Sequence, residues 1–220
     1  PHAHTPEPPR IPIPGFSLRN TIRGHEDTIS VLAWSPDGRY LASGSQDQTV
    51  RIWECSTGDP VGAPMLGHVG GVVDVTWAPD NETLVSGAFD GSVNFWRVRL
   101  AQPSRHIQVA GGAGVQHLGH PVAFSPDGRW LAVGMGGHRV VLFEAFSGRR
   151  VRSLESHTDI VLCLAWSPDS CYLASGSGDQ TVHIWDDQTN QSKWLRGHKS
   201  DVLCLTWAPD GSWLASGSQE

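Results

Sequence analysis

The sequence has little cysteine and no long apolar run. No apolar stretch approaches the roughly 20 residues that a membrane span requires, which excludes a membrane-spanning chain. The four cysteines among 220 residues include no C-x-x-C pair. So sparse a set argues against a disulfide framework and favours reduced, structural thiols, so we expect a cytoplasmic protein.

Basic side chains are also scarce. Sixteen lysines and arginines stand against 22 aspartates and glutamates, giving a net charge of −6. This balance makes nucleic acid an unlikely partner, because affinity for it rests on neutralised phosphates. No glycine-rich phosphate-binding motif is present, and we predict no cofactor and no metal site. Arginine outnumbers lysine fourteen to two, which suits a GC-rich genome and favours a bacterial source.

The first fifteen residues differ from the rest. Six prolines fall between Pro1 and Pro14, so residues 1–15 are predicted to be a stiff linker or tail. His2 and His4 in this segment are interpreted as a chance pair and not as metal ligands. Linkers join domains, which favours a chain that belongs to a multidomain protein.

The main feature of the sequence is a repeat of about 42 residues. Pro-Asp pairs begin at Pro36, Pro79, Pro126, Pro168 and Pro209. A histidine stands eleven residues before four of these prolines, and a tryptophan stands two residues before the same four. A period of this length indicates one small structural unit repeated in tandem, because a lone unit could not bury its apolar face.

Each unit is predicted to contain strands and no helix. In the first unit the runs 31–34, 40–45, 49–53 and 61–65 are short and apolar, and Pro36, Asp37 and Gly38 supply a tight turn. Four antiparallel strands cannot bury both faces of their sheet, so successive sheets must stack. The expected fold is all-β, a β-propeller of four-stranded antiparallel blades with four complete repeats and partial terminal blades.

The motifs resemble those of the WD-repeat family of β-propellers. Gly24-His25, Ser35-Pro-Asp-Gly38 and Asp47-Gln-Thr-Val-Arg-Ile-Trp53 carry the resemblance in the first unit, and Trp185-Asp186 keeps the dipeptide that names the family. The likeness covers residues 16–220. It implies a propeller that is part of a longer ring of about seven blades, or one that closes by self-association.

The resemblance also implies a buried hydrogen-bonded tetrad in each blade. The matching positions are His25, Ser43, Asp47 and Trp53; His68, Ser86, Asp90 and Trp96; His157, Ser175, Asp179 and Trp185; and, in the partial fifth unit, His198 and Ser216. A Ser-His-Asp set that recurs with a Trp is interpreted as internal bracing, not as a hydrolase triad, because a catalytic triad occurs once, at a cleft.

The third unit departs from this pattern. Its four tetrad positions hold Val115, Val133, Gly137 and Phe143. A partly satisfied polar network leaves buried groups unpaired, so the loss of all four members together predicts an apolar version of the blade. Residues 97–152 around this unit also hold eight arginines and two acidic residues, either as a binding edge or as a solvated cluster.

The resemblance implies a non-enzymatic scaffold or sensor that holds a protein or peptide, in a multidomain bacterial signalling or regulatory protein. An intramolecular effector domain or a second copy could also be the partner. The implied partner-binding face contains Thr28, Ser30, Gln46, Val73, Phe89, Leu118, His120, Ile160, Leu162, Asp201 and Leu203. These residues form either an exposed patch or a packed lining of the central channel.

Two other functions stay open from the sequence. A propeller that contributes to catalysis would need unrepeated acidic or histidine side chains converging on the channel, and Asp74 and His120 are the candidates. A purely architectural array is the second alternative.

Overall fold

The computed structural model describes residues 20–98, 102–108, 120–136, 138–155, 157–189 and 191–219 of the chain. This part of the protein folds into five antiparallel β-sheets. Within these ranges, no helix has the length and apolar character that crossing a bilayer demands. The prediction of an all-β fold is confirmed.

Three of the sheets have four strands each, taken in chain order. The second sheet contains β4 (Val72–Trp77), β5 (Thr83–Ala88), β6 (Ser92–Arg97) and β7 (Gln102–Gln108); the third contains β8 (Val122–Phe124), β9 (Trp130–Met135), β10 (Arg139–Glu144) and β11 (Arg150–Glu155); the fourth contains β12 (Val161–Trp166), β13 (Tyr172–Ser177), β14 (Thr181–Asp186) and β15 (Ser192–Arg196).

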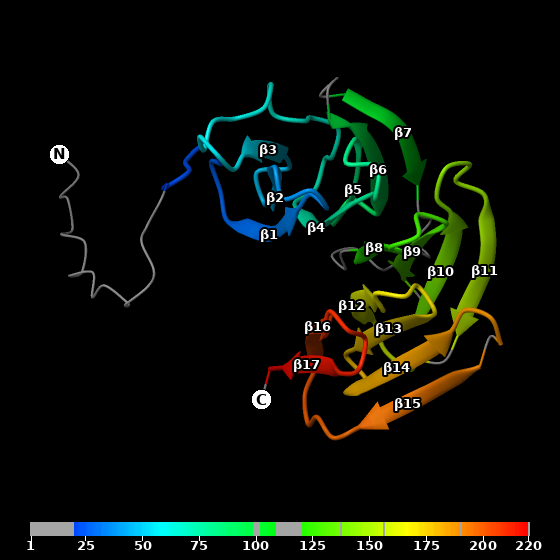
Figure 1. Cartoon of the computed structure of the whole chain (residues 1–220). Coiled ribbons are helices and arrows are strands. Elements are labelled where there is room, and N and C mark those ends of the chain that lie inside the picture. Colours follow the sequence, from blue (N-terminus) through cyan, green and yellow to red (C-terminus); the bar gives the residue numbers. More distant parts are fainter. Residues whose placement is uncertain are drawn as a thin grey trace.

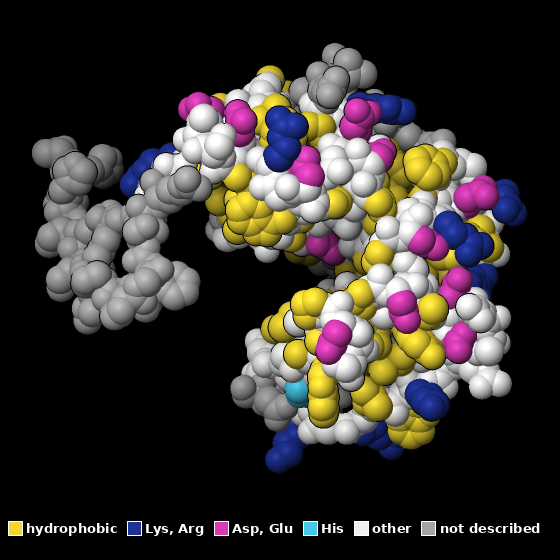
Figure 2. All heavy atoms as spheres, in the orientation of Figure 1, with side chains coloured by type: hydrophobic (Ala, Val, Ile, Leu, Met, Phe, Trp, Pro, Cys, Tyr) yellow, Lys and Arg dark blue, Asp and Glu magenta, His cyan; other side chains and the backbone are white. Residues whose placement is uncertain are grey.

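The two terminal sheets are smaller. The first contains β1 (Ile29–Trp34), β2 (Tyr40–Ser45) and β3 (Val50–Glu54), and the fifth contains β16 (Val202–Trp207) and β17 (Leu214–Ser218). The sheets succeed one another as propeller blades, with β1, β4, β8, β12 and β16 as their inner strands around a central space (Figure 1). The described sheets form an open arc, with a notch between the first sheet and the fifth (Figures 1 and 2).

The fourth strand predicted at residues 61–65 forms only in part. Two isolated bridges pair Val50 with Met65 and Trp53 with Pro60. Between them Gly62 has a φ of 78°, which lifts the chain out of strand geometry. Proline at positions 60 and 64 also supplies no N–H for a ladder. The first sheet therefore has three full strands and an irregular outer edge.

The core lies between neighbouring sheets and not inside any one of them. One cluster joins the first and second sheets through Met65 and Val72, and another joins the second and third through Val85 and Val122. A third cluster connects the third and fourth sheets. Each sheet thus depends on the next for burial of its faces, as the repeat length predicted.

Candidate functional site

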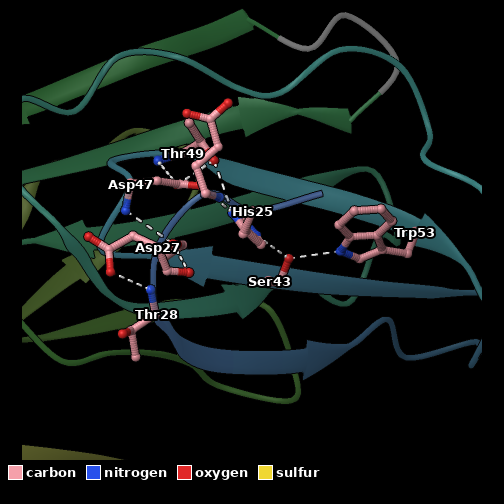
Figure 3. A network of polar contacts seen from close by, with 9 residues as sticks. His25, Asp27, Thr28, Ser43, Asp47, Thr49 and Trp53 are labelled. Atoms are coloured by element: carbon pink, nitrogen blue, oxygen red, sulfur yellow. Dashed lines mark hydrogen bonds and ion pairs between the residues drawn. The ribbon is translucent and has the colours of Figure 1, made fainter. Parts of the chain in front are cut away.

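A chain of four side chains crosses the first sheet (Figure 3). The Trp53 indole donates to Ser43 Oγ at 2.8 Å, and Ser43 Oγ lies 2.6 Å from His25 Nε2. Because the Asp47 carboxylate can only accept, the proton of the His25 ring lies on Nδ1, which leaves Nε2 to accept from the Ser43 hydroxyl group. That Nδ1 lies 2.8 Å from Asp47 Oδ2 and donates to it. The tautomer of His25 is therefore fixed by its two neighbours.

The second and fourth sheets repeat this chain at the same offsets. Ser86 Oγ lies 2.6 Å from His68 Nε2 and 2.8 Å from Trp96 Nε1, and both partners are buried. In the fourth sheet the corresponding chain runs from Trp185 through Ser175 and His157 to Asp179, with distances of 3.0, 2.8 and 2.9 Å. The structure thus brings together the members of all three sequence-assigned tetrads.

The carboxylate that ends each chain is held in its charged form. Burial on its own would raise the pKa of Asp179, but hydrogen bonds from Thr181, the Thr158 N–H and His157 outweigh it and lower the pKa to about 2. The same kinds of donors hold the pKa of Asp47 well below its usual range. The aspartate carboxylate therefore accepts hydrogen bonds from its own turn, from a neighbouring backbone N–H and from the imidazole, which is a structural role.

The third and fifth units differ, as their sequences imply. Val133 and Phe143 are buried in the apolar cluster between the second and third sheets. Val115 and Gly137 lie outside the described residues. In the fifth sheet His198 Nε2 lies 2.7 Å from Ser216 Oγ, but Ser216 is exposed.

One cluster of the fourth sheet could hold a metal ion. Donor atoms of His157, Asp179 and His183 all lie within 4.8 Å of one another. Both ring nitrogens of His157 already contact Ser175 and Asp179, however, just as in the other tetrads. The arrangement is explained by the tetrad with one added imidazole, and a metal would have to break it.

The inner strands enclose a central cavity of about 600 Å³. Five residues of the predicted partner-binding face line it: Ser30, Val73, Phe89, Leu162 and Leu203. Phe89 and Leu203 are nevertheless 37% and 49% exposed, so the lining reaches solvent. The sequence left open whether this face is an exposed patch or a lining of the central channel. These apolar side chains line the cavity and also remain accessible to solvent.

The other members of the predicted face do not line this cavity. Thr28 is exposed and Gln46 partly buried, and the Gln46 side chain donates to Ser30 Oγ at 2.9 Å. Ile160 and Asp201 accept backbone hydrogen bonds from the loops that follow β13 and β17. Leu118 lies outside the described residues.

His120 is not exposed, contrary to the expectation from its offset. Its side chain is buried, and Nδ1 donates to the Gly134 carbonyl at 2.7 Å. Its own carbonyl lies so close to Gly87 that a Cβ there would come within 2.1 Å of it. Burial also lowers the pKa of His120, which keeps the ring neutral. Close packing between the second and third sheets leaves this side chain no path to the surface.

Asp74 is the single charged side chain in the described lining of the cavity. Burial raises its pKa to about 7, despite hydrogen bonds from the Val122 and Val75 N–H groups at 2.9 Å each. Its two carboxyl oxygens thereby join β4 to the first strand of the third sheet. The cavity is thus an apolar space with one weakly acidic group.

Sequence reasoning missed several lining residues. Cys163 and Cys204 line the cavity from β12 and β16, and burial raises the pKa of Cys163 to about 12. Each inner strand of the first, second, fourth and fifth sheets has a register shift near its start, as between Val161 and Cys163. A bulge of this kind interrupts the alternation by which successive side chains of a strand point to opposite faces of the sheet. The apolar sequence of the inner strands does not show where such a bulge lies.

Four of the eight arginines in the arginine-rich segment form ion pairs. Arg97, Arg139 and Arg149 lie 3.7 to 3.8 Å from Glu82, Glu155 and Glu144 respectively. Arg152 pairs with Asp187 of the fourth sheet. These contacts favour a solvated cluster, whose charges are paired within the chain, over an edge that binds an acidic partner.

The repeated sheets and tetrads agree with a comparison with known families. The family described as WD domain, G-beta repeat matches residues 16–54, 60–97, 115–144, 148–186 and 189–220. The chain belongs to the WD40 family. The matched units include the third one, whose tetrad is apolar, so this WD40 blade keeps the family pattern without the polar network.

Curated relatives are WD-repeat proteins of much greater length. Nuclear distribution protein nudF of Emericella nidulans is 28% identical over 172 residues, which are 78% of this chain and 32% of that protein. WD repeat and SOCS box-containing protein 1 of Danio rerio is 39% identical over 81 residues, 36% of this chain and 19% of that protein. WD repeat-containing protein 1 of Mus musculus is 36% identical over 72 residues, which are 31% of this chain and 12% of that protein. The chain spans about a third or less of these relatives.

Proposed function

We propose that this WD40 chain is a non-enzymatic protein-interaction module that binds a peptide or protein segment at the central cavity. The observation that carries the proposal is the set of solvent-accessible apolar side chains at the cavity, foremost Phe89 and Leu203. Accessible apolar side chains gathered at a concave site support protein recognition, because binding energy concentrates at such positions.

The acidic group refines the expected partner. Asp74 lies among apolar side chains and offers a carboxyl group to whatever enters the cavity. A peptide with apolar side chains and one hydrogen-bond donor or cationic group would therefore fit the lining better than an acidic peptide.

The catalytic alternative has less support. It needs Asp74 and His120 to converge on one substrate, but His120 is buried against Gly134 and does not line the cavity. Both oxygens of Asp74 also accept backbone hydrogen bonds. We propose an interaction function, with no turnover.

We also propose that the module is the sensor or scaffold part of a larger cytoplasmic regulatory protein of bacterial origin, where an effector domain of the same protein can be the partner. The name of the Danio rerio relative states that WD repeats and a SOCS box share one chain in that protein. The excess of arginine over lysine supports the bacterial source. The gene sequence upstream of Pro1 and downstream of Glu220 tests this part directly.

A peptide-display selection tests the cavity. Peptides enriched on the wild-type chain are expected to lose at least about tenfold in affinity when Phe89 and Leu162 are both changed to serine, because both side chains line the cavity. Isothermal titration calorimetry measures the loss. Phe146→Ser is the matched control, since Phe146 is 74% exposed and is not among the cavity-lining residues. Equal binding by all three proteins, or no enrichment of any peptide, would overturn the proposal.

A further inference from the structure

The fourth sheet has a second buried imidazole beside its tetrad. His183 on β14 lies opposite Ser175 on β13, so the two side chains are on the same face of the sheet. The ring centroids of His183 and His157 are 4.1 Å apart, and both residues are buried. One nitrogen of each ring and one carboxylate oxygen of Asp179 lie within 4.8 Å of one another. Two imidazoles and a carboxylate therefore converge on one point.

Bracing of the sheet does not account for this histidine. The same strand position holds Arg51 in the first sheet, Asn94 in the second and Val141 in the third, as their pairing with the second strand shows. The first and second sheets form their tetrads with an arginine or an asparagine at this position. A tetrad therefore needs no second imidazole, and His183 distinguishes the fourth sheet from these three.

The donor atoms of this cluster suit a divalent transition metal. Imidazole nitrogen is a preferred ligand of Zn²⁺, Cu²⁺ and Ni²⁺, whereas Mg²⁺ and Ca²⁺ take sets of oxygen atoms. Two histidines and one carboxylate, with a water molecule in the fourth position, are a known ligand set for Zn²⁺, with bond lengths of about 2.0–2.2 Å. Since the three donors already lie within 4.8 Å of one another, small side-chain movements bring them to these distances.

The cluster is buried but not sealed from solvent. Asp179 and His183 line a pocket of about 430 Å³, together with Thr158, Thr181 and His198 among others. An ion can enter from this pocket and keep a water molecule as its fourth ligand. This pocket and the central cavity share no lining residue, so the two sites are separate.

We propose that His157, Asp179 and His183 bind one Zn²⁺ or a chemically similar transition-metal ion. The two imidazoles supply the nitrogen donors, and the carboxylate offsets part of the charge of the ion. The site differs from the proposed peptide-binding cavity in place and in ligand, and neither depends on the other.

Binding of the ion changes the tautomer of His157. In the structure Nδ1 carries the proton and donates a hydrogen bond to Asp179 at 2.9 Å. A nitrogen that binds a metal carries no proton, so the proton moves to Nε2, which lies 2.8 Å from Ser175 Oγ. Ser175 Oγ then accepts from Nε2 and from the Trp185 indole. The ion thus replaces the hydrogen bond between His157 and Asp179, and the rest of the tetrad stays connected.

Titration with Zn²⁺ tests the site. Isothermal titration calorimetry on the full chain should show one ion bound per chain, and Co²⁺ in its place should give the visible absorption bands of a four-coordinate ion. His183→Asn should bind Zn²⁺ at least about tenfold more weakly, because the loss of a ligand costs at least as much as the loss of an outer-shell partner. This variant copies Asn94, which stands beside an intact tetrad, so its circular dichroism should match that of the wild type.

The histidine pair near the start of the chain supplies the control. A double variant with His2→Ala and His4→Ala keeps all three proposed ligands and should bind Zn²⁺ as tightly as the wild type. Loss of binding in this double variant would place the ion at the pair and not in the fourth sheet.

NMR of the ring nitrogens gives a result that needs no substitution. Zn²⁺ should convert His157 from the Nδ1–H to the Nε2–H form. His25 and His68, whose tetrads lack a second imidazole, should keep the Nδ1–H form. The proposal is overturned if the wild type binds no ion, if His183→Asn binds as tightly as the wild type, or if the tautomer of His157 stays unchanged.

Discussion

Replacing Ser86 by alanine is expected to lower the free energy of unfolding by about 2–4 kcal/mol. The hydroxyl group of Ser86 accepts from Trp96 Nε1 and donates to His68 Nε2, and all three side chains are buried. Its removal leaves an indole N–H and an imidazole nitrogen without their partner, and each such group costs about 1–3 kcal/mol. Urea denaturation followed by tryptophan fluorescence measures the change.

The fifth sheet supplies a matched control for this prediction. Ser216 occupies the same position and lies 2.7 Å from His198, but it is exposed, so water can replace its hydroxyl group. Ser216→Ala should therefore cost less than about 0.5 kcal/mol. Similar losses for the two variants, or a loss below about 1 kcal/mol for Ser86→Ala, would contradict the idea that these networks brace the sheets.

The tetrads could be assigned from the sequence because its motifs resemble those of the WD-repeat family, in which the tetrad positions stand at fixed offsets. His68 and Ser86 are eighteen residues apart in the chain, as are His25 and Ser43, and the structure brings both pairs to 2.6 Å. The residue types carry the signal, since each donor meets an acceptor. The apolar third unit was equally evident, because its buried Val133 replaces a serine.

Side-chain orientation at the cavity could not be read in the same way. Register shifts at the start of the inner strands decide which residues turn inward, and they depend on how two strands pair. His120 was misplaced for a related reason, since it packs against Gly87 of another sheet. The irregular edge after β3 depends on Gly62, whose positive φ the apolar run 61–65 conceals. The strand pairing and the contact of His120 are tertiary features that a single strand's sequence does not contain, whereas Gly62 is a local feature that the sequence shows.

Asp74 is expected to make the free energy of unfolding fall as the pH rises. Burial raises the pKa of this carboxyl group from 3.8 to about 7 in the folded protein. Between these two values the folded state holds a proton that the unfolded chain has released. The free energy of unfolding contributed by Asp74 is therefore fully present below pH 4 and is lost as the pH rises towards 7. Three pH units at about 1.4 kcal/mol each give a loss of about 4 kcal/mol.

Asp74→Val isolates this contribution, because Val31 has the corresponding register in the first sheet. The variant also loses the acceptor of the Val75 and Val122 N–H groups, but that cost does not vary with pH. Subtracting the variant's free energy of unfolding from that of the wild type, at each pH from 4 to 8, should give a difference that falls by several kcal/mol. A difference that stays constant across this range would mean that the carboxyl group titrates normally.

His183 provides the opposite slope and so a check on the method. Burial and the adjacent His157 lower the pKa of His183 from 6.5 to about 4. Here the unfolded chain binds the proton first, so stability is lost as the pH falls from about 6.5 to 4. His183→Asn, which copies Asn94 of the second sheet, should remove that loss. If the two wild-type-minus-variant differences slope in opposite directions, the pH dependence arises from Asp74 and His183 and not from the surface charge that both variants share.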